Sequence, residues 1–300
     1  MLHNNLKENG IKVAPVLLST RERGFATKLY PVISDFNYLI VEAQIEGKTY
    51  YLDATNKYLT FGQLPYKCLN QYGRRLDFKN GSRWVDIEAK NVSSIQHKVD
   101  LKLNIEDEII EGTVEGKYLG YYATDKKDDY FSNQTQYIED MQNEQEDFYI
   151  SEHSVVTKDI TDSEFVENFD IEYEDLNFVG DEIILDPFLI KIFEQNPFKL
   201  QQRTYPVDFG YKQSFSYSLQ LDLGEEYTIE KLPEEVTSRL PAKGGNLVFN
   251  TQLQDNKLML FFKISFTKPI YEANHYPSLK RFMNKVVNAQ TKTLLVLKKK

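Results

Sequence analysis

The 300-residue chain is poor in cysteine and histidine, the side chains that bind zinc and other transition metals. It has one cysteine, Cys68, and four histidines, His3, His97, His153 and His275. A single cysteine excludes an internal disulfide and any zinc site built from several thiolates. Because no histidine has a second ligand at the spacing of a metal site, we expect neither a metal nor a cofactor.

Long apolar runs and an excess of basic residues are also missing. The longest apolar run, at 258–266, is interrupted by Lys263 and Ser265, whereas a membrane-spanning helix needs about 20 apolar residues. The formal net charge of −9 argues against a nucleic-acid partner, which would require a basic face to displace counterions. Residues 1–30 show no basic start followed by an apolar core, so the sequence predicts no signal peptide in this chain.

Motifs of several enzyme classes are absent as well. There is no glycine-rich phosphate loop, and Gly244 and Gly245 are typical of an ordinary turn. The Gly-x-Ser-x-Gly nucleophile motif is not present. Acidic clusters at 125–129 and 139–147 lack the residue order of a calcium loop, so we interpret them as solvated helix surface.

Aromatic residues are abundant and lie in alternating patterns. The 20 Tyr and 19 Phe favour strands, because flat rings pack well on pleated surfaces. Glu46 and Gly47 form a typical two-residue hairpin turn between strands predicted at 37–45 and 48–54. Apolar and polar residues alternate, as in half-buried strands, at 99–105, 110–118, 169–174, 215–223 and 258–266.

Three segments are predicted to be helical. Residues 1–9 resemble the end of a helix with Gly10 as its C-cap, and since no N-cap precedes it, we expect the chain to begin inside a domain. Residues 124–146 are polar and contain no Gly or Pro, which predicts a solvent-exposed helix. Pro277 opens a third helix, 277–290, with one apolar stripe.

Together these patterns predict an α+β, mainly β fold with sheets packed face to face. The connection before residue 79 contains several glycines and a proline, which suggests a domain boundary there. We expect a truncated domain at 1–78, a β-rich domain with one polar helix at 79–200, and a C-terminal, sandwich-like β domain at 201–300 that carries helix 277–290.

Two short stretches, FNYLI at 36–40 and YLDAT at 51–55, resemble the transglutaminase-like branch of the papain-type fold. Residues 6–16 resemble the end of that family's cysteine-bearing helix and the strand that follows. The resemblance extends to a group of multidomain bacterial envelope proteins, in which the transglutaminase-like domain lies between β-rich domains of unknown function. Its further anchors are LTFGQLP at 59–65, CLN at 68–70 and RTYPVDF at 203–209.

The resemblance implies a Cys–His–Asp triad, which this chain matches at one position. Asp53 takes the position of the Asp, Tyr38 stands where the His is expected, and the Cys position lies upstream of Met1. A tyrosine with its ordinary pKa near ~10 is a poor base at neutral pH. Cys68 follows Asp53 in the chain, so we expect it to be a small buried side chain. The resemblance therefore implies no catalytic residue, only Tyr38 and Asp53 as relics that share a structural hydrogen bond.

The leading hypothesis is a pseudoenzyme: a non-catalytic interaction or scaffold region of a transglutaminase-like protein of the periplasm or cell envelope. One alternative is a fragment of an active cysteine transglutaminase or peptidase whose nucleophile lies upstream of Met1. A second alternative is a glycan-binding β-sandwich, because Trp84 and the many tyrosines could stack on sugar rings. The sequence identifies no particular protein or glycan as the partner.

Overall fold

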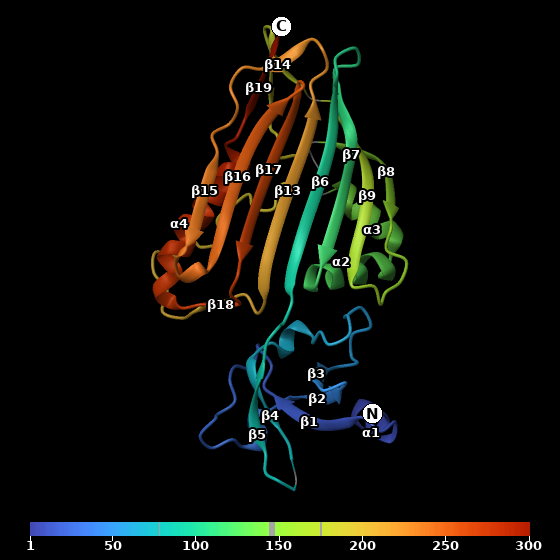
Figure 1. The fold of residues 1–300 in the computed structure, drawn as a ribbon, viewed down its shortest axis with the longest axis vertical. Coiled ribbons are helices and arrows are strands. Elements are labelled where there is room, and N and C mark those ends of the chain that lie inside the picture. Colours follow the sequence, from blue (N-terminus) through green and yellow to red (C-terminus); the bar gives the residue numbers. More distant parts are fainter. Residues whose placement is uncertain (78, 144–147, 175) are drawn as a thin grey trace.

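The computed structural model describes residues 1–300 except 78, 144–147 and 175. The molecule has two parts along its long axis: a small N-terminal part at the bottom of the view and a larger part above it, built on a broad sheet (Figure 1). Most elements are strands and few are helices, which confirms the predicted mainly β fold with a C-terminal helix.

The N-terminal part is a five-stranded antiparallel sheet with a short helix, α1 (Leu2–Glu8), beside it. The predicted hairpin is confirmed, since Glu46 and Gly47 both have positive φ angles, 51° and 76°, as a tight two-residue turn requires. The strands in spatial order are β3 (Lys48–Leu52), β2 (Tyr38–Ile45), β1 (Lys12–Leu18), β4 (Gln71–Arg75) and β5 (Arg83–Ile87).

The larger part is built on an eight-stranded sheet. Its long strands form because apolar and polar residues alternate along them, so that one face is buried and the other is not. In spatial order the strands are β15 (Val236–Leu240), β16 (Gly245–Gln254), β17 (Lys257–Phe266), β13 (Lys212–Asp222), β6 (Val92–Asn104), β7 (Ile109–Leu119), β9 (Glu164–Tyr173) and β8 (Tyr149–Val155).

A second layer covers one face of this sheet. The helix α4 (Tyr276–Thr291) and a four-stranded sheet lie behind it in Figure 1, and their apolar side chains share one core with the inner face of the eight-stranded sheet. The four strands are β10 (Asn177–Val179), β11 (Glu182–Leu185), β19 (Leu295–Lys299) and β14 (Tyr227–Ile229), and a two-stranded ladder joins β12 (Val207–Asp208) to β18 (Ile270–Tyr271).

The predicted boundary between residues 200 and 201 does not separate two cores. Strand β13 lies parallel to β6 along its whole length, so the predicted domains 79–200 and 201–300 contribute strands to one sheet. The same apolar core extends across both. A parallel pairing between strands more than a hundred positions apart leaves no local signal in the sequence. The first sheet also extends past the predicted end of its domain, because β5 reaches Ile87.

The single polar helix predicted at 124–146 is two helices, α2 (Tyr121–Ser132) and α3 (Gln134–Asn143). Asn133 interrupts them with an extended backbone, and its side-chain oxygen accepts a hydrogen bond from the Gln136 amide at 3.2 Å, as an N-cap does. Residues 144–146 lie outside the described residues. The helices are not wholly exposed, because Ala123, Lys127 and Tyr137 are buried.

Tyrosines and one ion pair join the two parts. Arg21 Nη1 lies 3.1 Å from Asp208 Oδ1, and the guanidinium sits 4.7 Å from the ring centre of Tyr66. Tyr66 meets Tyr211 edge to face at 5.9 Å between ring centroids, and Tyr121 Oη donates to the carbonyl oxygen of Leu64 at 2.7 Å. These contacts connect four segments distant in sequence, so they hold the N-terminal part in a defined position against the large sheet.

Candidate functional site

The two residues at the matched triad positions are brought together. Tyr38 opens β2 and Asp53 follows β3, the neighbouring strand of the hairpin, so both side chains lie at the same end of the sheet. Tyr38 Oη donates to Asp53 Oδ2 at 3.0 Å, which is the hydrogen bond predicted from the sequence. Burial raises the pKa of the Tyr38 hydroxyl above its ordinary value, and the negative charge of Asp53 raises it further.

Thr55 closes this arrangement, as expected of an Asp that ends a strand and is followed by Ala-Thr-Asn, where the Asp side chain commonly bonds the turn backbone. Its backbone amide donates to Asp53 Oδ1 at 2.8 Å and its hydroxyl donates to the same oxygen at 2.5 Å. The Thr55 hydroxyl also lies 3.0 Å from Tyr38 Oη. Both carboxylate oxygens of Asp53 are therefore engaged within a three-residue ring, and an Asp that caps a turn in this way has a sufficient structural role.

Cys68 lies near enough to Tyr38 and Asp53 for their charges to influence one another, although it follows Asp53 in the chain. It ends a short 3-10 turn, Tyr66–Cys68, that covers the core face of the first sheet, and its side chain is buried. Burial raises the pKa of the Cys68 thiol to about 12, and the charge of Asp53 acts in the same direction. The ammonium of the neighbouring Lys67 lies 4.5 Å from the ring centre of Tyr38.

The chemistry open to these groups is limited. A thiol is a nucleophile only as the thiolate, and a base is needed to hold and shuttle its proton. The pKa of Cys68 lies far above neutrality, Asp53 opposes its ionisation, and Tyr38 is itself a weaker acid than an ordinary tyrosine. The arrangement therefore has the geometry of a closed structural hydrogen-bond ring beside a protonated, buried thiol.

A second polar cluster lies under α2 and α3, where the sequence had predicted exposed surface. Glu167 of β9 is 1% exposed, and its Oε2 accepts a hydrogen bond from Tyr137 Oη at 2.7 Å. His153 Nε2 lies 2.9 Å from the same oxygen, and Lys126 Nζ lies 3.6 Å from Oε1. The alternation of β9 could have revealed it, because Glu167 shares the inward face with two buried phenylalanines.

Two hollows of the surface have linings that suit a ligand. The junction hollow, about 510 Å³, lies between the first sheet and the bottom of the large sheet, and it is lined by Tyr50, Tyr51, Phe61, Gln63, Glu88, Lys90 and Tyr121 among others. The outer hollow, about 450 Å³, lies on the outward face of β6, β13, β17 and β16.

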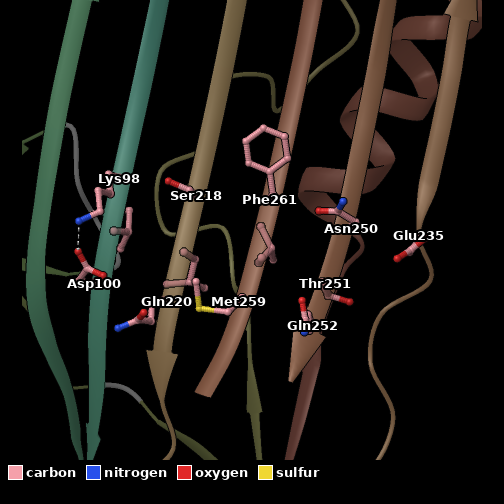
Figure 2. Close-up of a pocket in the computed structure, with 13 residues that line it drawn as sticks. Lys98, Asp100, Ser218, Gln220, Glu235, Asn250, Thr251, Gln252, Met259 and Phe261 are labelled. Carbon is pink, nitrogen blue, oxygen red and sulfur yellow. Dashed lines mark ion pairs between the residues drawn. The ribbon is translucent and has the colours of Figure 1, made fainter. Parts of the chain in front are cut away.

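Figure 2 shows the lining of the outer hollow. Ser218 and Gln220 lie between the ion-paired side chains of Lys98 and Asp100 on one side and the exposed Phe261 on the other. Asn250, Gln252 and Met259 complete the surface, so its lining is rich in hydroxyl and amide groups around one aromatic ring.

Within the described ranges, no group of three or more His, Cys, Asp or Glu side chains has the arrangement of a metal site. Among the helices that the structure describes, none combines the length and the apolar character that crossing a membrane requires.

Comparison with protein families finds one match. Residues 181–296 match a family described as a domain of unknown function with a solved structure, DUF3858. The match begins at β11, before the predicted boundary at 201, and so includes the strand that pairs with β19. No curated protein matches the chain.

Comparison with solved structures gives a distant similarity. A crystal structure described as that of a "putative protease" from Parabacteroides distasonis covers 98% of this chain with a TM-score of 0.49 and 10% sequence identity. This chain spans 41% of the length of that protein. A similarity at this level carries no argument about activity. Residues 181–296 are thus similar to a domain of unknown function, and they lie within a mainly β structure.

Proposed function

We propose that this chain is a non-catalytic interaction or scaffold region of a transglutaminase-like protein of the periplasm or cell envelope. The observation that supports the non-catalytic part is the ring of Tyr38, Asp53 and Thr55, which engages the carboxylate at the matched Asp position in structural hydrogen bonds. The resemblance of residues 36–55 to the transglutaminase-like branch supports the family and the location.

The test restores the missing base. We expect that neither the wild-type chain nor the Tyr38→His variant incorporates amines into glutamine side chains or cleaves peptide amides. An imidazole beside Asp53 would have no thiolate within reach, because Cys68 is buried and protonated. Tyr38→Phe serves as the control for loss of the hydrogen bond alone. Turnover in Tyr38→His that is absent from Tyr38→Phe would contradict the proposal.

The outer hollow favours glycan binding as a second candidate. Phe261 presents an exposed ring among serine, asparagine and glutamine side chains, and such a surface can stack on a sugar and hydrogen-bond its hydroxyls. A glycan array probed with the wild-type chain and with Phe261→Ala tests this candidate. Binding that is lost in Phe261→Ala supports it, and an array without any signal contradicts it.

A further inference from the structure

The junction hollow lies against the free edge of a sheet. Strand β3 is the outermost strand of the five-stranded sheet, and in the part of the chain that the structure describes no strand pairs with its outer side. Tyr50 and Tyr51 are consecutive residues of β3, and consecutive side chains of a strand point to opposite faces. Because Tyr50 and Tyr51 both line the junction hollow although their side chains point to opposite faces of the sheet, the hollow lies beside the edge of β3.

The register of the hairpin identifies which backbone groups face outward. Ile45 and Lys48 flank the two-residue turn and form a hydrogen-bonded pair, as do the residues two positions further along each strand. The N–H and C=O groups of Thr49 and Tyr51 therefore point away from β2. Lys90 Nζ donates to the Thr49 carbonyl at 3.1 Å, which confirms that this carbonyl is open to side chains from outside the sheet.

Aromatic side chains surround this edge. The side chain of Phe61 is 70% exposed. Its ring centroid lies 5.0 Å from that of Tyr50, and the two ring planes are inclined by 51°. Tyr121 is held in place by its hydrogen bond to Leu64. Pockets at the interface of two parts, with aromatic walls and a few polar groups, are typical ligand sites, and 510 Å³ is within their usual size.

We propose that the junction hollow binds an extended peptide segment of a partner protein, which adds to β3 as a sixth strand. The main chain of the peptide pairs with Thr49 and Tyr51 and displaces Lys90 from the Thr49 carbonyl. An apolar side chain of the peptide enters the hollow that Tyr50, Phe61 and Tyr121 line. Strand addition of this kind takes its affinity from main-chain hydrogen bonds and its specificity from the side-chain pocket.

Two features favour a peptide over a sugar at this place. The free main-chain donors and acceptors match another main chain in spacing and direction. The rings of Tyr50 and Phe61 pack on each other at a tilt of 51°, so they form one wall of the hollow rather than the flat platform on which a sugar stacks. The inference rests on the proposed interaction role and specifies the partner's chemistry.

Random peptides displayed on phage, selected against the full chain, provide the probe. A selected peptide is then titrated by fluorescence anisotropy against the wild-type chain and three variants. Phe61→Ala removes the exposed ring of the hollow, and Thr49→Pro removes an outward amide without breaking a hydrogen bond to β2. Phe178→Ala is the control, since Phe178 is also exposed on an edge strand, β10, of a different sheet.

We expect Phe61→Ala and Thr49→Pro each to weaken binding by about tenfold or more, as loss of a buried anchor or of an anchoring main-chain bond does, and Phe178→Ala to leave it unchanged. Hydrogen exchange on the wild-type chain keeps the test independent of how the variants fold. The amides of Thr49 and Tyr51 should exchange slowly only in the presence of the peptide.

Failure to select any peptide, or peptides that bind all four proteins equally, would overturn the inference. Binding of a neutral oligosaccharide that depends on Phe61 would overturn the assignment to a peptide. None of these outcomes tests the proposal that the chain is non-catalytic, which is contradicted only if the chain shows turnover.

Discussion

Glu167 is a residue of β9 at which three further elements, β8, α2 and α3, meet. Burial would raise the pKa of its carboxyl group, but the hydrogen bond from His153, the charge of Lys126 and the hydrogen bond from Tyr137 outweigh burial and hold this pKa below its usual range. These partners come from β8, α2 and α3, so one ionised side chain of β9 anchors both helices to the sheet. Removing a partner would leave a buried charge poorly compensated, which is costly.

Because of this cluster, we expect the folded chain to lose stability at acidic pH. His97 lies at its edge, 3.3 Å from Tyr118 Oη, and burial lowers the pKa of its imidazole from 6.5 to about 4. Because the imidazole accepts a proton less readily in the folded chain than in the unfolded chain, the free energy of unfolding is highest above pH 6.5 and falls as the pH drops toward 4. The whole decrease is at most about 3 kcal/mol. The lowered pKa of Glu167 has the same sign, because its contribution is present above the unfolded pKa of 4.5 and is lost at lower pH.

We therefore expect the free energy of unfolding, measured with urea, to fall between pH 7 and pH 4.5. The variant His97→Phe should lose most of this dependence while keeping an apolar ring in the core. The groups that face this region are Tyr118, Lys126, Tyr137, His153 and Glu167. A wild-type chain equally stable at both pH values would contradict the account.

At the scale of elements, α4 is the helix whose sequence pattern and packing agree best. Its prediction at 277–290 is close to the observed Tyr276–Thr291, and its apolar stripe is buried. Phe282 is 3% exposed and meets Phe266 of β17 edge to face at 5.8 Å between centroids. The stripe therefore closes the core beneath the large sheet.

Phe282→Asp should destabilise the molecule by about 3–5 kcal/mol, because it removes an aromatic ring and buries an unpaired charge. The matched control is Lys285→Asp, which places the same side chain on the exposed face of the helix. Thermal unfolding of both variants measures the effect. If Phe282→Asp melted at the wild-type temperature, the helix could not be packed as described.

Local features of the fold were predictable and long-range pairings were not. The hairpin turn at Glu46 and Gly47 and the alternation in β17 depend on neighbours in the chain, and their predictions agree with the structure. The pairing of β13 with β6 and the burial of Glu167 depend on distant segments, whereas the break at Asn133 has a local cause, the N-cap hydrogen bond, that was not predicted. The Tyr38–Asp53 hydrogen bond was predictable because both residues belong to one hairpin, whereas the approach of Cys68 was not.

At the scale of the whole molecule, the N-terminal part depends on the rest of the chain. Its core includes Val85 and Ile87 of β5 and also Tyr121 of α2. The junction adds the ion pair of Arg21 with Asp208. The first sheet is therefore completed by residues that lie beyond the predicted domain 1–78.

A fragment of residues 1–78 should consequently not unfold cooperatively, since it lacks one strand and the side chains that cover its core. Circular dichroism during heating, compared with the same signal for the full chain, measures this. A sharp thermal transition in the fragment would show that the sheet is complete without β5 and Tyr121.

The central proposal is that the chain has no working nucleophile, and one measurement tests it most directly. A thiol-reactive active-site probe and an amine-incorporation assay are applied at pH 7.5 to the native wild-type chain and to Cys68→Ser. With a buried thiol of pKa about 12, the account predicts no rapid labelling and no amine incorporation in either protein. Rapid labelling together with incorporation in the wild-type chain, both abolished in Cys68→Ser, would make Cys68 the catalyst and contradict the account.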